Sequence, residues 1–407
     1  MAGWRGETFA ARIARMLSTA KLCADQMQVG QPLAFDAFDD DGHLLLRKGF
    51  VIHDPRQLAA LIERGLYRNG GAGGTPDPGI PAQAPQSGLA PHRYSVFQLL
   101  ADLQHQLDQL LTAPPDAGFN THMQAIAAQL QRGVRLDGDA AIASMLIRHE
   151  GRYSVRRMVH SAILCELMMV ELGQSDVQRQ GLTCAALSMN IAMLDLQDVL
   201  YAQPAPPSAA QRAQVRAHPQ DGVSMLRARG VTDETWLSLV EQHHETIDGK
   251  GYPQHLQGGA IARFAQLLSL ADRYGAMATG RAYRGPALPN LVLKQIFMDK
   301  DKSVDAGLAA LLVKTVGIYP PGSAVELANG DVAIVVKRTR NANQPVLRCV
   351  KTWRKEILEQ PRKRMTTEPG HAIARLIAAS ELGFALDHER LWDGGLEFDP
   401  AEESSIS

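Results

Sequence analysis

The chain has 407 residues and a nearly balanced charge, with 42 lysines and arginines against 43 aspartates and glutamates. At about 150 residues per domain, this length predicts two or three domains. The balance excludes the strongly basic composition typical of nucleic-acid binders, so no DNA partner is expected. Apolar residues make up 45% of the chain, which is enough to form hydrophobic cores.

The cysteines and the hydropathy pattern bear on the compartment. Cys23, Cys165, Cys184 and Cys349 lie far apart and form no CxxC pair. A disulfide framework or a zinc knuckle is therefore not expected, and a reducing cytoplasm is the predicted location. No run approaches the ~18 to 20 apolar residues of a membrane span, so no such span is predicted.

The first part of the chain predicts a small folded unit followed by a linker. Residues 1–28 are basic and amphipathic, which predicts an N-terminal helix. Residues 29–69 predict a small α/β domain: an Asp-Gly turn ending at Gly42 joins two strands, and Asp54-Pro55 begins an apolar helical stripe. Glycine and proline dominate residues 70–91, which predicts a flexible linker.

The sequence pattern changes twice in the rest of the chain. Residues 92–317 carry one helical stripe after another, which predicts an all-α domain. Residues 318–356 begin with a proline-glycine breaker and continue as short apolar runs, which predict a β appendix. For residues 357–407 we expect a C-terminal helix and an acidic tail.

Five residues of the predicted helical domain form a candidate metal-binding constellation. They are His160, His218, the adjacent pair His243 and His244, and Asp272. Neutral imidazole and carboxylate suit iron, manganese or zinc, and facing helices can aim them into one bundle core. Spacing alone is a weak signal, because single histidines are common as hydrogen-bonded or surface residues.

The segment from His243 to Pro253 reads HHETIDGKGYP, which has the form HHExxDGxGYP. It resembles the signature of the HD-GYP family, a subgroup of the HD superfamily that hydrolyses cyclic di-GMP. Shorter matches surround Val159-His160-Ser161, Ala217-His218-Pro219 and Leu270-Ala271-Asp272, and the resemblance covers about residues 153–317. It implies a mainly α fold: an HD-type helical bundle with the small α/β N-terminal domain and the short β-rich C-terminal appendix.

The resemblance also implies roles for individual residues. It assigns His218, His243 and His244 to one metal, and leaves His160 and Asp272 as the vestige of a second metal site. The implied cofactor is one divalent ion (iron, manganese or zinc), or none. Tyr252, Arg281 and Arg284 match positions that meet cyclic di-GMP or a related dinucleotide. The GYP loop, which has been proposed to contact diguanylate cyclase domains, comprises Asp248, Gly249, Gly251, Tyr252 and Pro253.

The chain departs from the family where the histidine-aspartate pair should stand. The family's AALLHDIGK reads AALSMNIAM here, so Met189, Asn190 and Met193 replace histidine, aspartate and lysine. The neutral amide of Asn190 does not bridge two cations as a carboxylate does, and a thioether is a poor ligand for hard metals. Arg156, one helical turn before His160, adds a positive charge. No residue is therefore assigned to catalysis.

Three functional hypotheses follow. The first is a degenerate HD-GYP protein in cyclic di-GMP signalling that binds ligand or partner with little or no phosphodiesterase activity. The second is a residual metal-dependent phosphodiesterase that uses a mononuclear three-histidine site. The third is a pure protein-interaction scaffold, in which Gly249, Gly251 and Pro253 only shape a turn and the two arginines are solvated surface charges.

Overall fold

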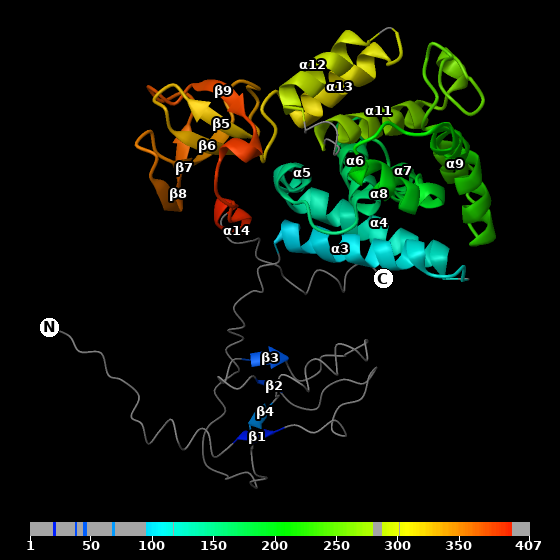
Figure 1. The fold of residues 1–407 in the computed structure, drawn as a ribbon, viewed down its shortest axis with the longest axis horizontal. Coiled ribbons are helices and arrows are strands. Elements are labelled where there is room, and N and C mark those ends of the chain that lie inside the picture. The colour runs from blue at the N-terminus through cyan, green and yellow to red at the C-terminus, as the bar shows by residue number, and fades with distance from the viewer. Residues whose placement is uncertain are drawn as a thin grey trace, which may run out of the picture. The chain divides into compact units, whose positions relative to one another are not determined.

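The computed structural model describes residues 95–279, 287–300 and 302–392, except residue 117, together with four short N-terminal strands. The chain divides into two compact units, Met1–Gly88 and Leu89–Ser407 (Figure 1). The division falls within the glycine- and proline-rich residues 70–91.

The described part of the first unit is a four-stranded sheet in the order β1-β4-β2-β3, with all pairs antiparallel. Its strands are β1 (Thr19–Lys21), β2 (Ala37–Phe38), β3 (Leu44–Leu46) and β4 (Tyr67–Asn69). Ala37 pairs with Leu46 and Phe38 with Leu44, which confirms the predicted pairing of these two strands.

One prediction for the first unit is wrong. The helix expected over residues 1–28 does not extend through Thr19–Lys21, because these residues pair with β4 and form strand β1. Cross-strand hydrogen bonding to a distant segment overrides the local helical pattern there. The rest of that helix, the helix expected after Asp54 and the linker over residues 70–91 lie outside the described residues.

The second unit begins with a helical bundle, which confirms the predicted all-α domain (Figure 1). Its helices are α3 (Val96–Thr112), α4 (Phe119–Leu136), α5 (Gly138–Ile147), α6 (Tyr153–Glu171), α7 (Asp176–Ser188), α8 (Leu194–Ala202), α9 (Ala209–Ala228), α10 (Glu234–Gln242), α11 (Arg263–Ala278), α12 (Pro289–Met298) and α13 (Ala306–Val316). Two short 3-10 helices, η2 (Ile191–Met193) and η3 (Gly258–Ala260), interrupt the series.

Helix α6 lies inside this bundle and organises it. Almost all of its residues are buried, and it contacts α3, α4, α5, α7, α8, α11 and α13. A helix that is buried around its whole circumference is expected only at such a central place. Any polar side chain on α6 is therefore held in a low-dielectric interior.

Side-chain caps fix where the helices that carry the site begin. Ser175 and Ser208 form capping boxes with Gln178 and Gln211 at the starts of α7 and α9. Asp233 accepts hydrogen bonds from two backbone N–H groups at the start of α10. Each cap satisfies backbone donors that a helix N-terminus leaves unpaired, so the sequence sets the phase of each helix.

A five-stranded antiparallel sheet follows in the order β8-β7-β6-β5-β9. Its strands are β5 (Ala324–Leu327), β6 (Val332–Lys337), β7 (Val346–Lys351), β8 (Ile357–Met365) and β9 (Ile373–Ile377). The first three confirm the strands predicted within residues 318–356.

The C-terminal helix predicted within residues 357–407 is wrong for its first part. Residues 357–365 form edge strand β8 on β7, residues 373–377 form β9 on β5, and α14 is only His388–Leu391. Pro361 is compatible with β8 because an edge strand tolerates a missing donor. The acidic tail from residue 393 onward lies outside the described residues.

Two apolar clusters cover the two faces of the sheet, and the helical bundle has its own large core. Among the described residues, no helix is both long and apolar enough to cross a membrane. Cys165, Cys184 and Cys349 are buried free thiols.

Candidate metal centre and ligand site

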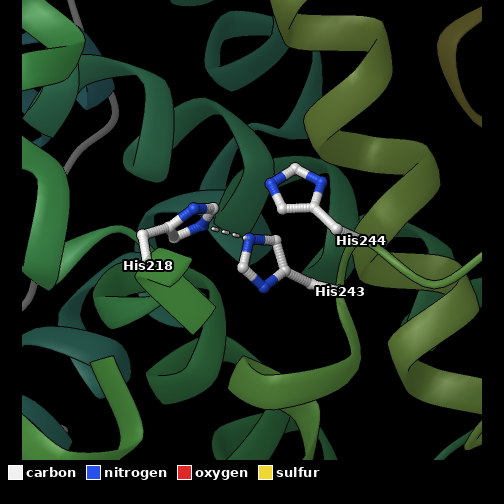
Figure 2. Close-up of side chains that lie close together, drawn as sticks. All are labelled: His218, His243 and His244. Carbon is white, nitrogen blue, oxygen red and sulfur yellow. Dashed lines mark hydrogen bonds between the residues drawn. The ribbon is translucent and has the colours of Figure 1, made fainter. Parts of the chain in front are cut away.

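Three histidines converge in the helical bundle. His218 lies in α9, His243 is the C-cap of α10, and His244 follows it (Figure 2). One ligand nitrogen from each ring lies within 4.8 Å of the other two. The structure therefore brings together the three residues that the sequence assigned to a metal.

Two backbone carbonyls set the tautomers of His218 and His243. The Nδ1 atom of His218 lies 2.6 Å from the oxygen of Val215, and that of His243 lies 2.6 Å from the oxygen of Val240. A carbonyl can only accept, so each Nδ1 carries the proton and each Nε2 presents a lone pair. The two Nε2 atoms are 3.2 Å apart. In that protonation state their contact (dashed in Figure 2) is an approach of two lone pairs, which a cation satisfies.

Burial keeps all three rings in the form that binds metal. Desolvation, followed by the neighbouring His243, lowers the pKa of His218 to about 3. Desolvation also lowers the pKa of His243 and, together with its two histidine neighbours, that of His244. Neutral imidazoles are the metal-binding species, so this donor set fits one divalent ion.

Asp272 does not present a free carboxylate to this centre. It lies on α11, and Arg157 of α6 holds it with two parallel hydrogen bonds, from Nε to Oδ1 at 3.0 Å and from Nη2 to Oδ2 at 2.7 Å. Nη2 also lies 3.2 Å from the backbone oxygen of Asp272. The two residues are only 7% and 4% exposed, so the pair is fully internal. Burial alone lowers the pKa of Arg157, but Asp272 and Tyr153 together outweigh it and raise that pKa.

His160 lies on the same helix in a cationic environment. Its Nδ1 is buried and has no hydrogen-bond partner among the described residues. Desolvation, then Arg156, His149 and Arg157, lower the pKa of His160 to about 3. Arg156, which the sequence singled out, donates to the backbone oxygen of His149 and lies over the Tyr153 ring. Sequence reasoning missed Arg157, although a second arginine among the apolar residues of α6 was a signal for it.

The altered family segment lies where α7 ends. The helix stops at Ser188, and Met189 and Asn190 lead into η2, which contains Met193. Met189 and Asn190 are buried. Both polar atoms of the Asn190 side chain are buried without a hydrogen-bond partner among the described residues. These positions therefore bring no negative charge to the centre.

The segment after the histidines folds back onto them. The backbone N–H of Tyr252 donates to the oxygen of His244, and the two rings stack with centroids 4.7 Å apart. A Cβ at Gly251 would lie 2.5 Å from the backbone of His244, Glu245 and Thr246, so only glycine allows this approach. Glu245 accepts from the N–H groups of Gln254 at 2.6 Å and Leu256 at 3.0 Å.

The remaining GYP-loop residues shape the turn and its exposed end. Asp248 accepts from Thr246 and from the N–H of Lys250, and Gly249 has a φ of 73°. Burial, then Asp272, raises the pKa of Tyr252, so its phenol keeps its proton. Arg281 and Arg284, the predicted dinucleotide contacts, lie outside the described residues.

Comparisons with known proteins agree with this fold. Residues 139–307 match the model of the HD domain family, a metal-dependent class of helical domains. The helical domain of this chain is therefore similar to HD domains of the HD-GYP type.

The names of curated relatives refer to cyclic dinucleotides. A cyclic di-GMP phosphodiesterase of Pseudomonas aeruginosa is 26% identical over 222 residues, which is 53% of this chain and 52% of that protein. A 3'3'-cGAMP-specific phosphodiesterase of Vibrio cholerae is 26% identical over 157 residues, 38% of this chain and 36% of the relative. A solved HDG"Y"P protein of Bdellovibrio bacteriovorus is 16% identical with a TM-score of 0.47, and the match covers 73% of this chain and 98% of that one. The chain spans about half or less of the length of these two curated relatives.

Proposed function

We propose that this protein acts in cyclic dinucleotide signalling as an HD-GYP domain that binds cyclic di-GMP or a related dinucleotide with little or no phosphodiesterase activity. The observation that carries the proposal is the double hydrogen bond between Arg157 and Asp272. Hydrolysis by two metals needs anionic ligands that hold the cations together. Asp272 is already neutralised, and Asn190 stands where the family has its bridging aspartate.

The ligand-facing half of the site supports dinucleotide binding. Tyr252 presents a protonated phenol and a ring fixed on His244, which suits stacking or hydrogen bonding at a nucleotide. The named relatives act on cyclic di-GMP or 3'3'-cGAMP. Arg281 and Arg284 remain predicted phosphate contacts, since arginine offers paired donors to phosphate oxygens.

The three-histidine cluster defines what the chain's own residues contribute. His218 and His243 hold their protons on Nδ1 and aim Nε2 at one point, and His244 adds a third ring whose orientation Tyr252 fixes. A divalent ion held there supplies Lewis acidity toward a phosphate. The fixed tautomers mean that His218 and His243 bind a cation through Nε2 rather than shuttle protons.

Calorimetric titration with cyclic di-GMP, pGpG and 3'3'-cGAMP, together with chromatography of the products, tests the proposal. We expect saturable heat with at least one of these dinucleotides and no multiple turnover. Tyr252→Ala should weaken binding about tenfold, because stacking on one base contributes about 1–3 kcal/mol. Lys294→Ala, an exposed change on α12, should leave binding unchanged. Brisk turnover by the wild-type protein would contradict the proposal.

A second candidate, residual phosphodiesterase activity with one metal, is favoured by the two carbonyl-fixed tautomers. It predicts about one equivalent of iron, manganese or zinc and slow release of pGpG. His243→Ala should abolish both the metal and the product. Slow turnover that persists in His243→Ala would exclude this candidate.

A third candidate is a scaffold that contacts a diguanylate cyclase domain through the GYP loop. The observation behind it is the exposure of Lys250, Gln254 and His255 around that loop. It predicts no heat with any dinucleotide and capture of a purified cyclase domain, weakened by Lys250→Glu. Heat with cyclic di-GMP and no capture would exclude it.

A further inference from the structure

We propose that Arg157 takes the place of a metal cation at Asp272 and so limits this centre to the single ion that the three histidines can hold. The inference deepens the proposed function, because it concerns the metal content of the same site. Its test uses the protein and metal without nucleotide. Failure of this proposal can therefore be distinguished from failure of the proposed function.

The first step concerns charge. A buried carboxylate must be paired with a cation or bound to a metal. Arg157 meets that requirement for Asp272 through both carboxylate oxygens, and its Nη2 also reaches the backbone oxygen of the same residue. The planar guanidinium matches a carboxylate geometrically, which makes this arrangement more specific than a point charge.

The second step concerns two further positions of the family's metal-ligand set. His160 has a buried Nδ1 without a hydrogen-bond partner, and Asn190 has both side-chain polar atoms in that condition, among the described residues. Unpaired buried polar atoms are rare and need an explanation. They are explained as the neutral remainder of a ligand set whose cation has been replaced by the guanidinium bound to Asp272.

The third step compares this remainder with the three-histidine cluster. His218, His243 and His244 place three nitrogens within 4.8 Å, and two of them have their tautomers fixed for binding. At Asp272 an incoming dication would meet the positive charge of Arg157, which already holds both carboxylate oxygens. Metal stoichiometry should therefore be one, with Arg157 as the residue that determines it.

Metal titration of matched variants tests this assignment. Equilibrium dialysis against Mn²⁺, followed by elemental analysis, should give one equivalent for the wild-type protein and one for Asn190→Asp. The double variant Asn190→Asp/Arg157→Met should take up a second equivalent at least tenfold more tightly than Asn190→Asp. The control is Asn190→Asp/Arg156→Met, because the neighbouring Arg156 is equally buried but bonds to His149 instead. This control should remain at one equivalent.

Two outcomes of the dialysis overturn the proposal: two equivalents in Asn190→Asp alone, or no second equivalent in the double variant. Thermal unfolding in chelator gives an independent check should the double variant fold poorly. Arg157→Met should lower the midpoint by several degrees, and Arg157→Met/Asp272→Asn should recover most of it, because both buried charges are then gone. Unfolding of Arg157→Met at the wild-type midpoint would also overturn the proposal.

Discussion

At the residue scale, the two carbonyls of Val215 and Val240 do as much for the metal centre as the imidazoles they hold. Each lies three residues before its histidine, so the bond forms within the last turn that precedes the ring. Fixing the proton on Nδ1 leaves Nε2 ready to bind without a change of tautomer. Because the rings are already held in this geometry, less conformational entropy is lost when a metal binds.

Glu245 anchors the segment that follows the GYP loop. Its carboxylate is 1% exposed and accepts from the N–H groups of Gln254 and Leu256. These bonds fix the segment that follows Tyr252. Glu245 therefore acts as a positioning residue for the ring that stacks on His244.

We predict that Glu245→Gln destabilises the protein by about 2–3 kcal/mol. The amide keeps one acceptor but turns an N–H₂ group toward a backbone N–H, and hydrogen bonds to a charged acceptor contribute about 1.5–3 kcal/mol. Urea unfolding measures this effect. Glu241→Gln on the preceding helix is the control and should cost less than about 0.5 kcal/mol. Equal effects of the two variants would show that Glu245 is not an anchor.

The residues of the site were only partly predictable from the sequence. The resemblance of HHETIDGKGYP and of the segment around His218 to the HD-GYP signature identified the three-histidine cluster, because such a motif is visible in the sequence itself. The partnership of Arg157 with Asp272 was not predictable, since 115 positions separate them. Sequence reasoning weighed Arg156 instead, and only the phase of α6 decides which of the two arginines reaches α11.

At the scale of elements, α6 connects the site to the rest of the bundle. Toward its C-terminal end Glu166 is 1% exposed and receives a hydrogen bond of 3.0 Å from Gln131 of α4. Its other carboxylate oxygen lies 3.2 Å from Nε of Arg179 on α7. Three helices therefore share one interior carboxylate.

This junction predicts a pH-dependent contribution to stability. Burial raises the pKa of Glu166 above its ordinary value of 4.5, and the hydrogen bond from Gln131 and the positive charge of Arg179 offset only part of that effect. Between the ordinary pKa of Glu166 and its higher pKa in the folded protein, the folded state binds more protons than the unfolded state. Stability from this group therefore falls as pH rises from about 4 through the folded-state pKa.

The difference in unfolding free energy between the wild-type protein and Glu166→Gln isolates this contribution. As pH increases from about 4 to 7, the wild-type protein should lose stability relative to the variant. Urea unfolding at a series of pH values measures the difference. A change in the opposite direction would mean that Arg179 outweighs the cost of burial.

Helices and strands were predictable where their sequence signals are local. The strands from Ala324 to Val350 and the stripe of α3 follow from periodicity alone. Edge strand β8 was not predictable, because its charged sequence ILEQPRKRM gains its conformation from pairing with β7. Local propensity does not contain that partner.

At the scale of the second unit, polar and close backbone contacts attach the sheet to the helical bundle. Arg338, just after β6, forms an ion pair with Asp139 of α5 and donates to the oxygen of Thr315 at the end of α13. Gly322 approaches the backbone of Ala143 in α5. These contacts couple the β appendix to a helix that also packs on α6.

Gly322→Ala should disrupt this attachment. A Cβ there would lie 2.9 Å from Cα and 3.0 Å from the oxygen of Ala143, and the residue has a φ of 89°. The steric conflict and the left-handed backbone together should cost about 2–4 kcal/mol. Gly383→Ala shares the positive φ, at 74°, but has open space around it, so it should cost about 1 kcal/mol.

Hydrogen exchange distinguishes a loosened attachment from general destabilisation. In Gly322→Ala, amides of α5 and β6 should lose protection by a larger factor than those of α9 and α10, because the conflict lies only where the sheet meets α5. Gly383→Ala should change protection in both regions little. Uniform loss across the second unit in Gly322→Ala would instead mean that sheet and bundle unfold as one cooperative body.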